Sequence, residues 1–173
     1  MNLVATDLTR LPTNKSNMNY MVIAVDYFSK YVIAGALPAK EATSVCRFLL
    51  DSFFWPRGSA RSMLSDNGQE FKSALSKKIL DLMQVKQRFT SPCHPQANGL
   101  GERMNGVITT IVAKLGMEWA PEHGEKVRTG REREDSSTNW SDLLPEALHW
   151  YNFKKSAATG FCPHEIVHPG VGK

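Results

Sequence analysis

Three short runs of apolar and β-branched residues open the chain. They cover Val4–Leu8, Tyr20–Asp26 and Tyr31–Leu37, and Pro, Asn, Gly and Lys residues separate them. Runs of this length and composition are typical of β-strands, and short connections favour antiparallel neighbours. The first part of the chain therefore predicts an antiparallel meander of three strands.

From Glu41 onward the apolar residues recur every three and four positions, which is typical of an amphipathic helix. This helix is predicted to end before Pro56 and Gly58. The remaining pattern predicts, in chain order, a strand at Ser62–Ser65, a helix over 71–83, a strand at Val85–Thr90, a helix from Asn98 or Gly99 to Trp119, and a helix from Trp140 to Tyr151. The order of elements predicts an α/β fold in which helices flank a mixed five-stranded sheet.

Two segments interrupt these patterns. The residues at about 120–139 have almost no apolar content and mixed charge, which predicts a mobile loop. Gly160 and Pro163 are predicted to break the chain after the last helix. We therefore expect one domain over residues 1–168, followed by a loose tail over 169–173.

Charge and cysteine content set wide bounds on function. Lys and Arg outnumber Asp and Glu by 21 to 17, which permits a polyanionic partner without requiring one. The three cysteines form no CxxC pair, as expected in a reducing compartment. Because no apolar run approaches the ~18 residues that span a bilayer, we expect a soluble, intracellular chain with no membrane partner. Large apolar residues are expected in the core rather than stacked on bases: Tyr20, Val22, Phe28, Phe48, Phe53, Phe71, Phe89 and Trp150.

Three carboxylates stand where predicted elements begin or end. Asp7 and Asp66 lie at the ends of predicted strands, and Glu102 lies on the first turn of the long helix. Together they are hard oxygen ligands of the kind that Mg²⁺ and Mn²⁺ prefer. Each also has a structural interpretation: Asp66 opens an Asp-Asn-Gly turn, and Glu102 shares a polar helix face with Asn98, Asn105 and Thr109 that solvent alone could cover.

Four segments carry a resemblance to a known family. They are Val4–Thr9, Val25–Tyr31, Leu64–Phe71 and His94–Asn105, and 35 residues lie between Asp66 and Glu102. These blocks, in this order and with this spacing, resemble the integrase catalytic core of Ty3/gypsy retrotransposons and retroviruses, whose signature is D,D(35)E. The resemblance extends over nearly the whole chain.

The resemblance implies both a fold and an activity. The fold is RNase H-like, a mixed five-stranded sheet flanked by helices. Asp7, Asp66 and Glu102 would be catalytic and would hold two Mg²⁺ (or Mn²⁺) ions for in-line displacement at phosphorus. The implied enzyme is a metal-dependent polynucleotidyl transferase and nuclease that processes the 3′ ends of retroelement DNA and joins them to target DNA. The substrate implies a nuclear site of action, and the family implies a possible homodimer.

Residues around the carboxylates match family positions that line the site. The implied nucleic-acid contacts are Asn67, His94, Gln96, Asn98, Arg103 and Asn105, and Lys30 and Lys114 add positive charge for phosphates. The asparagines, His94 and Gln96 fit equally well as turn formers or helix caps.

Departures from the family pattern keep two alternatives open. The loop Thr9–Pro12 lacks one residue and a glycine, which predicts strain beside Asp7, and Cys93 and Gly101 replace larger residues. One alternative is a decayed or domesticated core that only binds nucleic acid or protein. The other is an RNase H-like nuclease that acts outside transposition.

Overall fold

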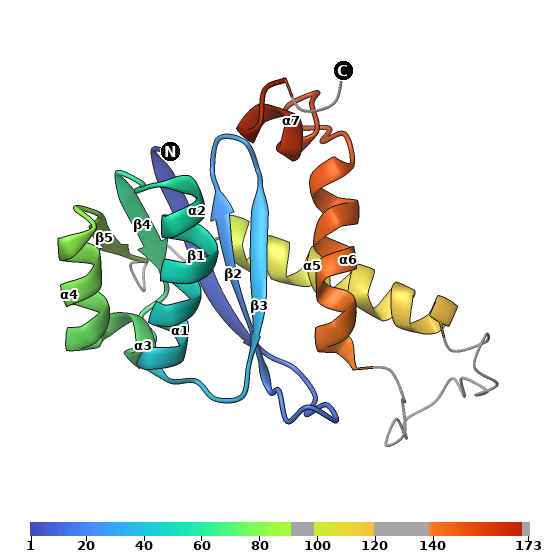
Figure 1. Ribbon diagram of the computed structural model, residues 1–173, viewed down its shortest axis with the longest axis horizontal. Coiled ribbons are helices and arrows are strands. Elements are labelled where there is room, and N and C mark those ends of the chain that lie inside the picture. Colours follow the sequence, from blue (N-terminus) through green and yellow to red (C-terminus); the bar gives the residue numbers. More distant parts are fainter. Residues whose placement is uncertain (91–98, 120–138, 171–173) are drawn as a thin grey trace.

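The computed structural model describes residues 1–90, 99–119 and 139–170 of the chain (Figure 1). Their secondary structure follows the predicted order closely. The elements are β1 (Leu3–Arg10), β2 (Tyr20–Asp26), β3 (Val32–Leu37), α1 (Ala42–Phe48), the π-helical segment η1 (Leu49–Phe54), α2 (Trp55–Arg57), β4 (Ser62–Ser65), α3 (Gln69–Lys72), α4 (Ala74–Leu82), β5 (Lys86–Phe89), α5 (Gly99–Trp119), α6 (Trp140–Phe153) and α7 (Pro163–Val167).

The five strands form one mixed sheet in the order β3-β2-β1-β4-β5. β1, β2 and β3 are antiparallel neighbours, whereas β4 runs parallel to both β1 and β5. In the register of the central strands, Ala5 lies opposite Val25 on one side and Leu64 on the other. The predicted mixed five-stranded sheet is confirmed, and β1 lies at its centre.

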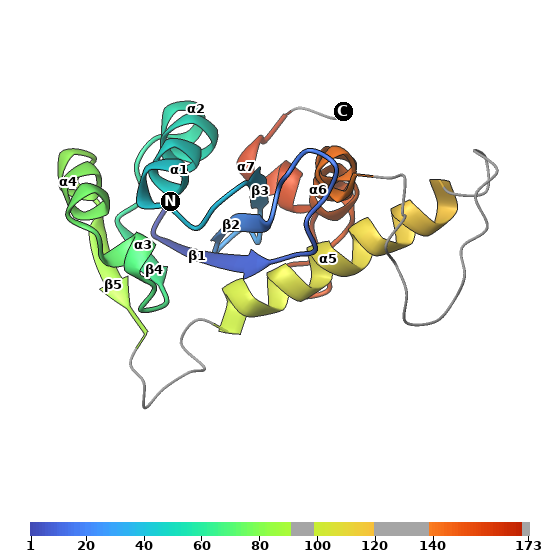
Figure 2. The ribbon, with the colours of Figure 1, turned by 90° about the horizontal axis from the view of Figure 1, so that it is seen from below.

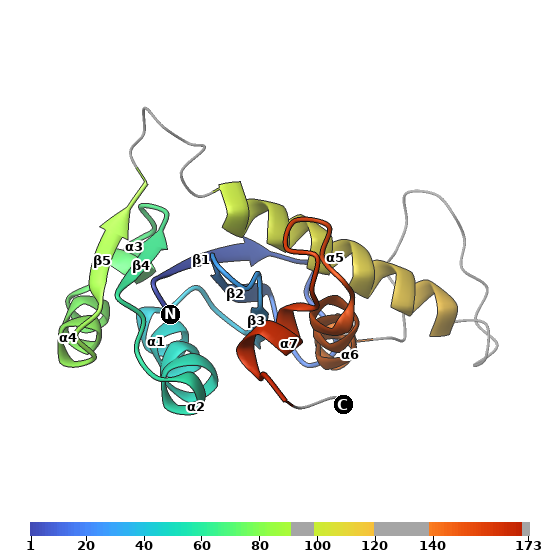
Figure 3. The same ribbon diagram turned by 90° about the horizontal axis from the view of Figure 1, so that it is seen from above.

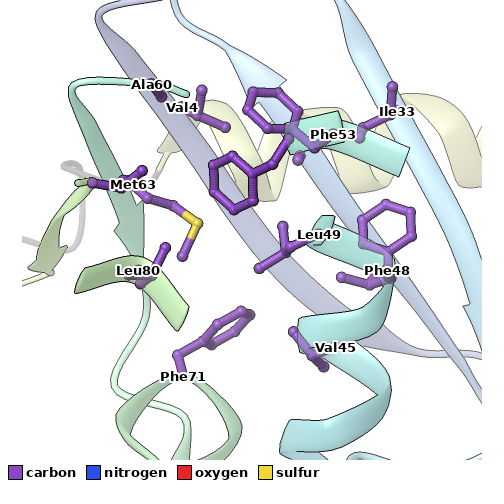
Figure 4. Packing of buried hydrophobic residues seen from close by; sticks show 14 of the residues in the cluster. Val4, Ile33, Val45, Phe48, Leu49, Phe53, Ala60, Met63, Phe71 and Leu80 are labelled. Atoms are coloured by element: carbon purple, nitrogen blue, oxygen red, sulfur yellow. The ribbon is translucent and has the colours of Figure 1, made fainter. Parts of the chain in front are cut away.

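Two apolar clusters cover the two faces of the sheet, because successive strand residues point to opposite faces. On one face, Val4 and Met63 pack against residues of α1, η1 and α4 (Figure 4). On the other face, Met21, Ile23 and Val25 pack against α5 and α6. Figures 2 and 3 show α1 and α5 on opposite sides of the sheet, with the start of α5 close to β1 and β4.

The first helix runs past its predicted end. Helical structure continues through η1 and α2 to Arg57, and Gly58 ends it with a φ of 76°. Pro56 has no N–H to donate to the carbonyl of Ser52. The Arg57 guanidinium donates to that oxygen instead, at 2.6 Å, and it also lies over the Tyr31 ring. A side chain thus replaces the missing backbone bond, so the proline does not end the helix.

Two further predictions on helices need correction. The helix predicted over 71–83 is split, because Ser73 has extended backbone angles and its hydroxyl caps α4 by accepting a bond from the Ser76 N–H at 3.0 Å. The predicted break at Gly160 and Pro163 is followed by α7, with Pro163 in its first turn and Glu165 accepting a bond from the Cys162 N–H at 3.0 Å.

Some residues expected in the core are exposed. Phe28 is 76% exposed on the β2–β3 turn, Trp150 is 61% exposed on α6, and Phe89 is 39% exposed on the edge strand β5. The pattern misled here because each residue faces away from the sheet or lies at its rim. The polar loop predicted at about 120–139 lies, apart from Asn139, outside the described residues, as do residues 171–173 of the predicted tail. Among the described helices, none is long and apolar enough to cross a membrane.

Candidate active site at the carboxylates

Asp7 lies on the central strand and faces α5. Val4 belongs to the α1 face of β1, so Asp7, three residues later, points to the opposite face. The side chain is half-buried, and its Oδ2 accepts a bond at 2.5 Å from Nδ2 of Asn105, a residue of α5 that is only 5% exposed. The helix that covers this face therefore also holds the carboxylate.

Asp66 follows β4 directly and lies beside Asp7. Because Ala5 pairs with Leu64 in the parallel β1–β4 register, Asp7 and Asp66 stand at the same level on neighbouring strands. The Asp66 Oδ1 accepts a bond from the Gly68 N–H at 3.0 Å, which is the bond of an Asp-initiated turn. The turn interpretation of Asp66 is thus correct, and it places this carboxylate next to Asp7 rather than excluding a role in chemistry.

Glu102 is exposed on the first turn of α5. The alternative of a solvated polar face around it fails for two residues. Asn105 is buried, and the Thr109 hydroxyl is buried with no hydrogen-bond partner among the described residues. The reason is that α5 lies against β1 and β2, so these side chains face the sheet.

The environment of Asp7 includes the charges of the other two predicted carboxylates. Burial raises the pKa of Asp7, and the negative charges of Asp66 and Glu102 raise it further. The hydrogen bonds from the Leu8 backbone and from Asn105 act in the opposite direction and lower it. A cation beside Asp7 would offset the effect of these negative charges.

The three carboxylates have the ligand atoms that a divalent cation needs, but their side chains do not surround a common point. Within the described part of the chain, no three His, Cys, Asp or Glu side chains lie close enough to enclose a metal ion. Carboxylate oxygens are nevertheless the ligands that Mg²⁺ and Mn²⁺ prefer. Asp7, Asp66 and Glu102 could hold such an ion if their side chains approached it.

The other predicted site residues divide into three groups. Asn67 is exposed beside Asp66, and its Nδ2 donates to the carbonyl of Thr90 at 2.7 Å, which ties the turn to the end of β5. Arg103 is exposed on α5 next to Glu102. The remaining three, His94, Gln96 and Asn98, lie outside the described residues, as does Cys93.

The two lysines proposed for phosphate contact are placed differently. Lys30 lies in the β2–β3 turn with a φ of 63°, and its Nζ donates to the carbonyl of Tyr27 at 2.7 Å. Lys114 is exposed on α5. The structure therefore gives Lys30 a role in closing its own turn.

The segment after Asp7 does not show the expected strain. β1 continues to Arg10, and the Leu11 N–H donates to the carbonyl of Asn19 at 2.8 Å. None of residues 9–12, all of them described, has a positive φ. The expectation of strain is wrong, because the segment continues as regular strand and pairs with Asn19 beyond it.

Sequence reasoning missed one carboxylate near the site, Glu70. It lies in the first turn of α3, where an acidic residue is ordinarily exposed, yet it is only 3% exposed. Periodicity over so short a helix gives no signal of burial.

Comparison with known proteins decides the family. The integrase core domain family matches residues 1–95, which is more than half of the chain. The chain belongs to the integrase core domain family. It is 30% identical over 144 residues to the Gag-Pol polyprotein of avian reticuloendotheliosis virus, covering 82% of this chain and 11% of the polyprotein. It is 27% identical over 164 residues to that of koala retrovirus, covering 95% and 9%.

Solved structures agree on the fold. The HTLV-2 integrase catalytic core domain, solved in complex with magnesium in a trimeric form, superposes with a TM-score of 0.74 at 18% identity over 96% of each chain. A chain of the simian T-cell lymphotropic virus intasome gives a TM-score of 0.77 at 18% identity over 99% of this chain and 56% of the other. These matches confirm the RNase H-like fold of an integrase core.

Proposed function

We propose that this chain is the catalytic core of a DNA integrase and that Asp7, Asp66 and Glu102 are its catalytic residues. The supporting observation is that three carboxylates come from β1, the end of β4 and the first turn of α5, and that the charges of Asp66 and Glu102 both raise the pKa of Asp7. In a member of the integrase core domain family, this grouping is best explained by phosphoryl transfer on DNA.

The proposed cofactor is two Mg²⁺ (or Mn²⁺) ions held by these carboxylates. When bound, the ions would activate the attacking oxygen and stabilise the leaving oxygen at phosphorus. The protein's own contribution is orientation: Asn105 holds the Asp7 carboxylate, and the Gly68 amide holds that of Asp66. Glu102, exposed at the start of α5, is free to swing toward a bound ion.

The proposed reaction is trimming of the 3′ ends of retroelement DNA followed by transfer of those ends to target DNA. Asn67 and Arg103, exposed beside two of the carboxylates, are proposed to contact phosphates, and His94, Gln96 and Asn98 are proposed to do so by their match to the family. Contacts of this kind weaken as salt concentration rises. The substrate would place the protein in the nucleus.

The parent element and the assembly are also proposals. The chain spans 8% to 12% of the length of the first curated relatives that it matches, which include the Pol polyprotein of the Drosophila melanogaster transposon 412, 21% identical over 165 residues. We propose an origin in a Ty3/gypsy-type or retroviral element on this basis. Self-association as a homodimer or a larger assembly is proposed because two of the structural neighbours are a trimeric form and an intasome.

The alternative of a core that binds without cutting stays open because the segment Thr9–Pro12 and positions Cys93 and Gly101 depart from the family pattern. A decayed or domesticated core would keep the fold and the carboxylates' positions but would not bind the ions. The third possibility, an RNase H-like nuclease, differs in substrate and would cut RNA–DNA hybrids.

The deciding experiment is calorimetric titration of the folded protein with Mn²⁺, with and without retroelement-end DNA, followed by strand transfer on labelled DNA. Asp66→Asn and Glu102→Gln are expected to abolish both binding and transfer. The matched controls are Asp81→Asn on α4 and Glu41→Gln just before α1. They make the same chemical changes at exposed positions.

The outcomes separate the three functions. Loss of Mn²⁺ binding in the two site variants, but not in the controls, supports the catalytic core. If the folded wild type does not bind Mn²⁺ even with DNA present, the catalytic function is excluded and a core that only binds nucleic acid or protein is supported. Preference for cleaving an RNA–DNA hybrid over DNA would support the RNase H-like alternative.

A further inference from the structure

Glu70 is a buried carboxylate that the proposed chemistry does not use. Its side chain is 1% exposed, and neither carboxylate oxygen has a hydrogen-bond partner among the residues that the structure describes. Among the same residues, its one charged contact is the Lys40 ammonium, 3.2 Å from Oε1, on a side chain that is 44% exposed. Burying a carboxylate with no hydrogen bond and a single, partly exposed cation beside it is unfavourable, which indicates that this position serves a purpose other than stability.

The Glu70 carboxylate packs directly on the backbone of Gly68. A Cβ built at Gly68 would lie 2.7 Å from Glu70 Cδ and 2.8 Å from Oε2, which is closer than real Cβ contacts. The backbone of Gly68 itself, with φ −56° and ψ 142°, is open to any residue. Glycine is therefore needed at this position for the approach of the carboxylate and not for the turn's dihedral angles.

Gly68 in turn contacts the proposed ligand Asp66. Its N–H donates to the Asp66 Oδ1 at 3.0 Å. The carboxylate of Glu70 thus packs against Gly68, and the N–H of Gly68 orients Asp66.

The other side of Glu70 is fixed by α3 and α4. Its carbonyl accepts bonds from the hydroxyls of Ser73, at 3.3 Å, and Ser76, at 2.5 Å. The next residue, Phe71, points into the apolar cluster that includes Val45 (Figure 4). The backbone of Glu70 is therefore held in place, so the position of its side chain against Gly68 is fixed as well.

We propose that Glu70 is a positioning residue: held by Lys40, its carboxylate packs on Gly68 and fixes the Asp66–Gly68 turn so that Asp66 faces Asp7. Lys40 stands two residues before α1, so the pair links the helix layer on one face of the sheet to the carboxylates on the other. This inference rests on the proposed function for its consequence, which is metal affinity, but not for its geometry.

The test compares the full chain with Glu70→Gln, which keeps the side chain's size and removes its attraction to Lys40. Two quantities are measured: the affinity for Mn²⁺ by calorimetry, and amide hydrogen exchange at Gly68 by NMR in the metal-free protein. Removing the partner of a metal ligand commonly weakens binding by about 10-fold to 100-fold. We expect about tenfold weaker Mn²⁺ binding and faster exchange at Gly68. Glu41→Gln, next to Lys40 and exposed, is expected to change neither.

Two further variants keep the test sharp if Glu70→Gln does not fold. Lys40→Met is expected to weaken Mn²⁺ binding and speed exchange at Gly68, whereas Lys40→Arg, which keeps the charge, is expected to preserve both. In a double-mutant cycle, Gly68→Ala is expected to destabilise the wild type but to have little effect in a Glu70→Ala background.

The results distinguish this inference from the proposed function. Wild-type affinity and exchange in Glu70→Gln and Lys40→Met would overturn the positioning role and leave the integrase proposal intact. If the folded wild type binds no Mn²⁺, the proposed function fails, and exchange at Gly68 alone then supports or overturns the contact between Glu70 and the turn.

Discussion

Replacing Asn105 with aspartate tests the contact at the centre of the site. The two side chains have the same shape, so Asn105→Asp changes one NH₂ group to an oxygen and leaves packing intact. In the wild type this NH₂ donates to Asp7 Oδ2 from a side chain that is 5% exposed. The variant would lose the donor and set a second carboxylate against Asp7, in a region where Asp66 and Glu102 already raise the pKa of Asp7.

The expected cost follows from two effects. A hydrogen bond to a charged group contributes about 1.5–3 kcal/mol. Two unit charges 4 Å apart repel by about 4 kcal/mol at an effective dielectric constant of about 20. The folded variant can limit the repulsion by binding one proton between the two carboxylates. We therefore expect a loss of about 3–5 kcal/mol in the free energy of unfolding at pH 7.5.

The pH dependence has a definite sign. The paired carboxylates retain a proton in the folded state at pH values where both have lost theirs in the unfolded state. Stability then falls as pH rises, by up to about 1.4 kcal/mol per pH unit, between the unfolded pKa of about 3.9 and the higher pKa of the pair. The deficit relative to wild type is thus smaller near pH 5 than at pH 7.5.

Urea unfolding followed by tryptophan fluorescence from pH 5 to pH 8, in EDTA, measures this effect. Asn2→Asp, the same change at an exposed position, is the control. A deficit in Asn105→Asp that stays the same at every pH would refute the contact with an ionised Asp7. Adding Mg²⁺ is expected to reduce the deficit, and a deficit indifferent to Mg²⁺ would count against a metal ion at Asp7 while leaving the contact itself established.

Three further predictions can be checked by the same unfolding measurement. The pKa of Asp7 is raised in the folded state, so loss of its proton as pH rises lowers the stability of the metal-free protein. Asp7→Asn is therefore expected to raise metal-free stability at pH 7.5 and to abolish stabilisation by Mg²⁺. A metal-free variant less stable than wild type would contradict this. Asn152→Ala removes buried bonds of 2.9 Å and 2.8 Å to a backbone N–H and carbonyl of β3 and is expected to cost about 2–4 kcal/mol. Gly35→Ala places a Cβ 2.7 Å from Phe48 and is expected to cost about 1–3 kcal/mol, whereas Gly106→Ala, in an open part of α5, should cost nothing.

Strand positions followed from the sequence because their signal is local. Tyr20–Asp26 was predicted with the bounds that β2 has, because a continuous run of apolar and β-branched residues is recognised within a few positions. The helix ends were less predictable. Arg57 supplies the bond that Pro56 cannot make, and a contact between a side chain and a carbonyl five residues away leaves no trace in hydrophobic periodicity.

The identity of the three carboxylates came from resemblance, and their meeting came from tertiary structure. Neither the hydrophobic pattern nor the residue spacing predicts that Asp7 and Asp66 lie side by side. The parallel register of β1 and β4 places them so. The polar face of α5 was predicted by period, but its direction was not. Asn105 and Thr109 directly follow Met104 and Ile108, two members of the buried apolar stripe of α5. Packing of that stripe on the sheet therefore also buries these two polar groups.

The sequence by itself determined the five strands, the helices α5 and α6, their order and the chemical kinds of side chain available, because propensity and periodicity act over a few residues. Only the tertiary structure decided that Asn105 holds Asp7 and that Glu70 lies buried on Gly68. Burial and charge proximity depend on residues tens of positions apart, and these distances are set when the two helix layers close over the sheet.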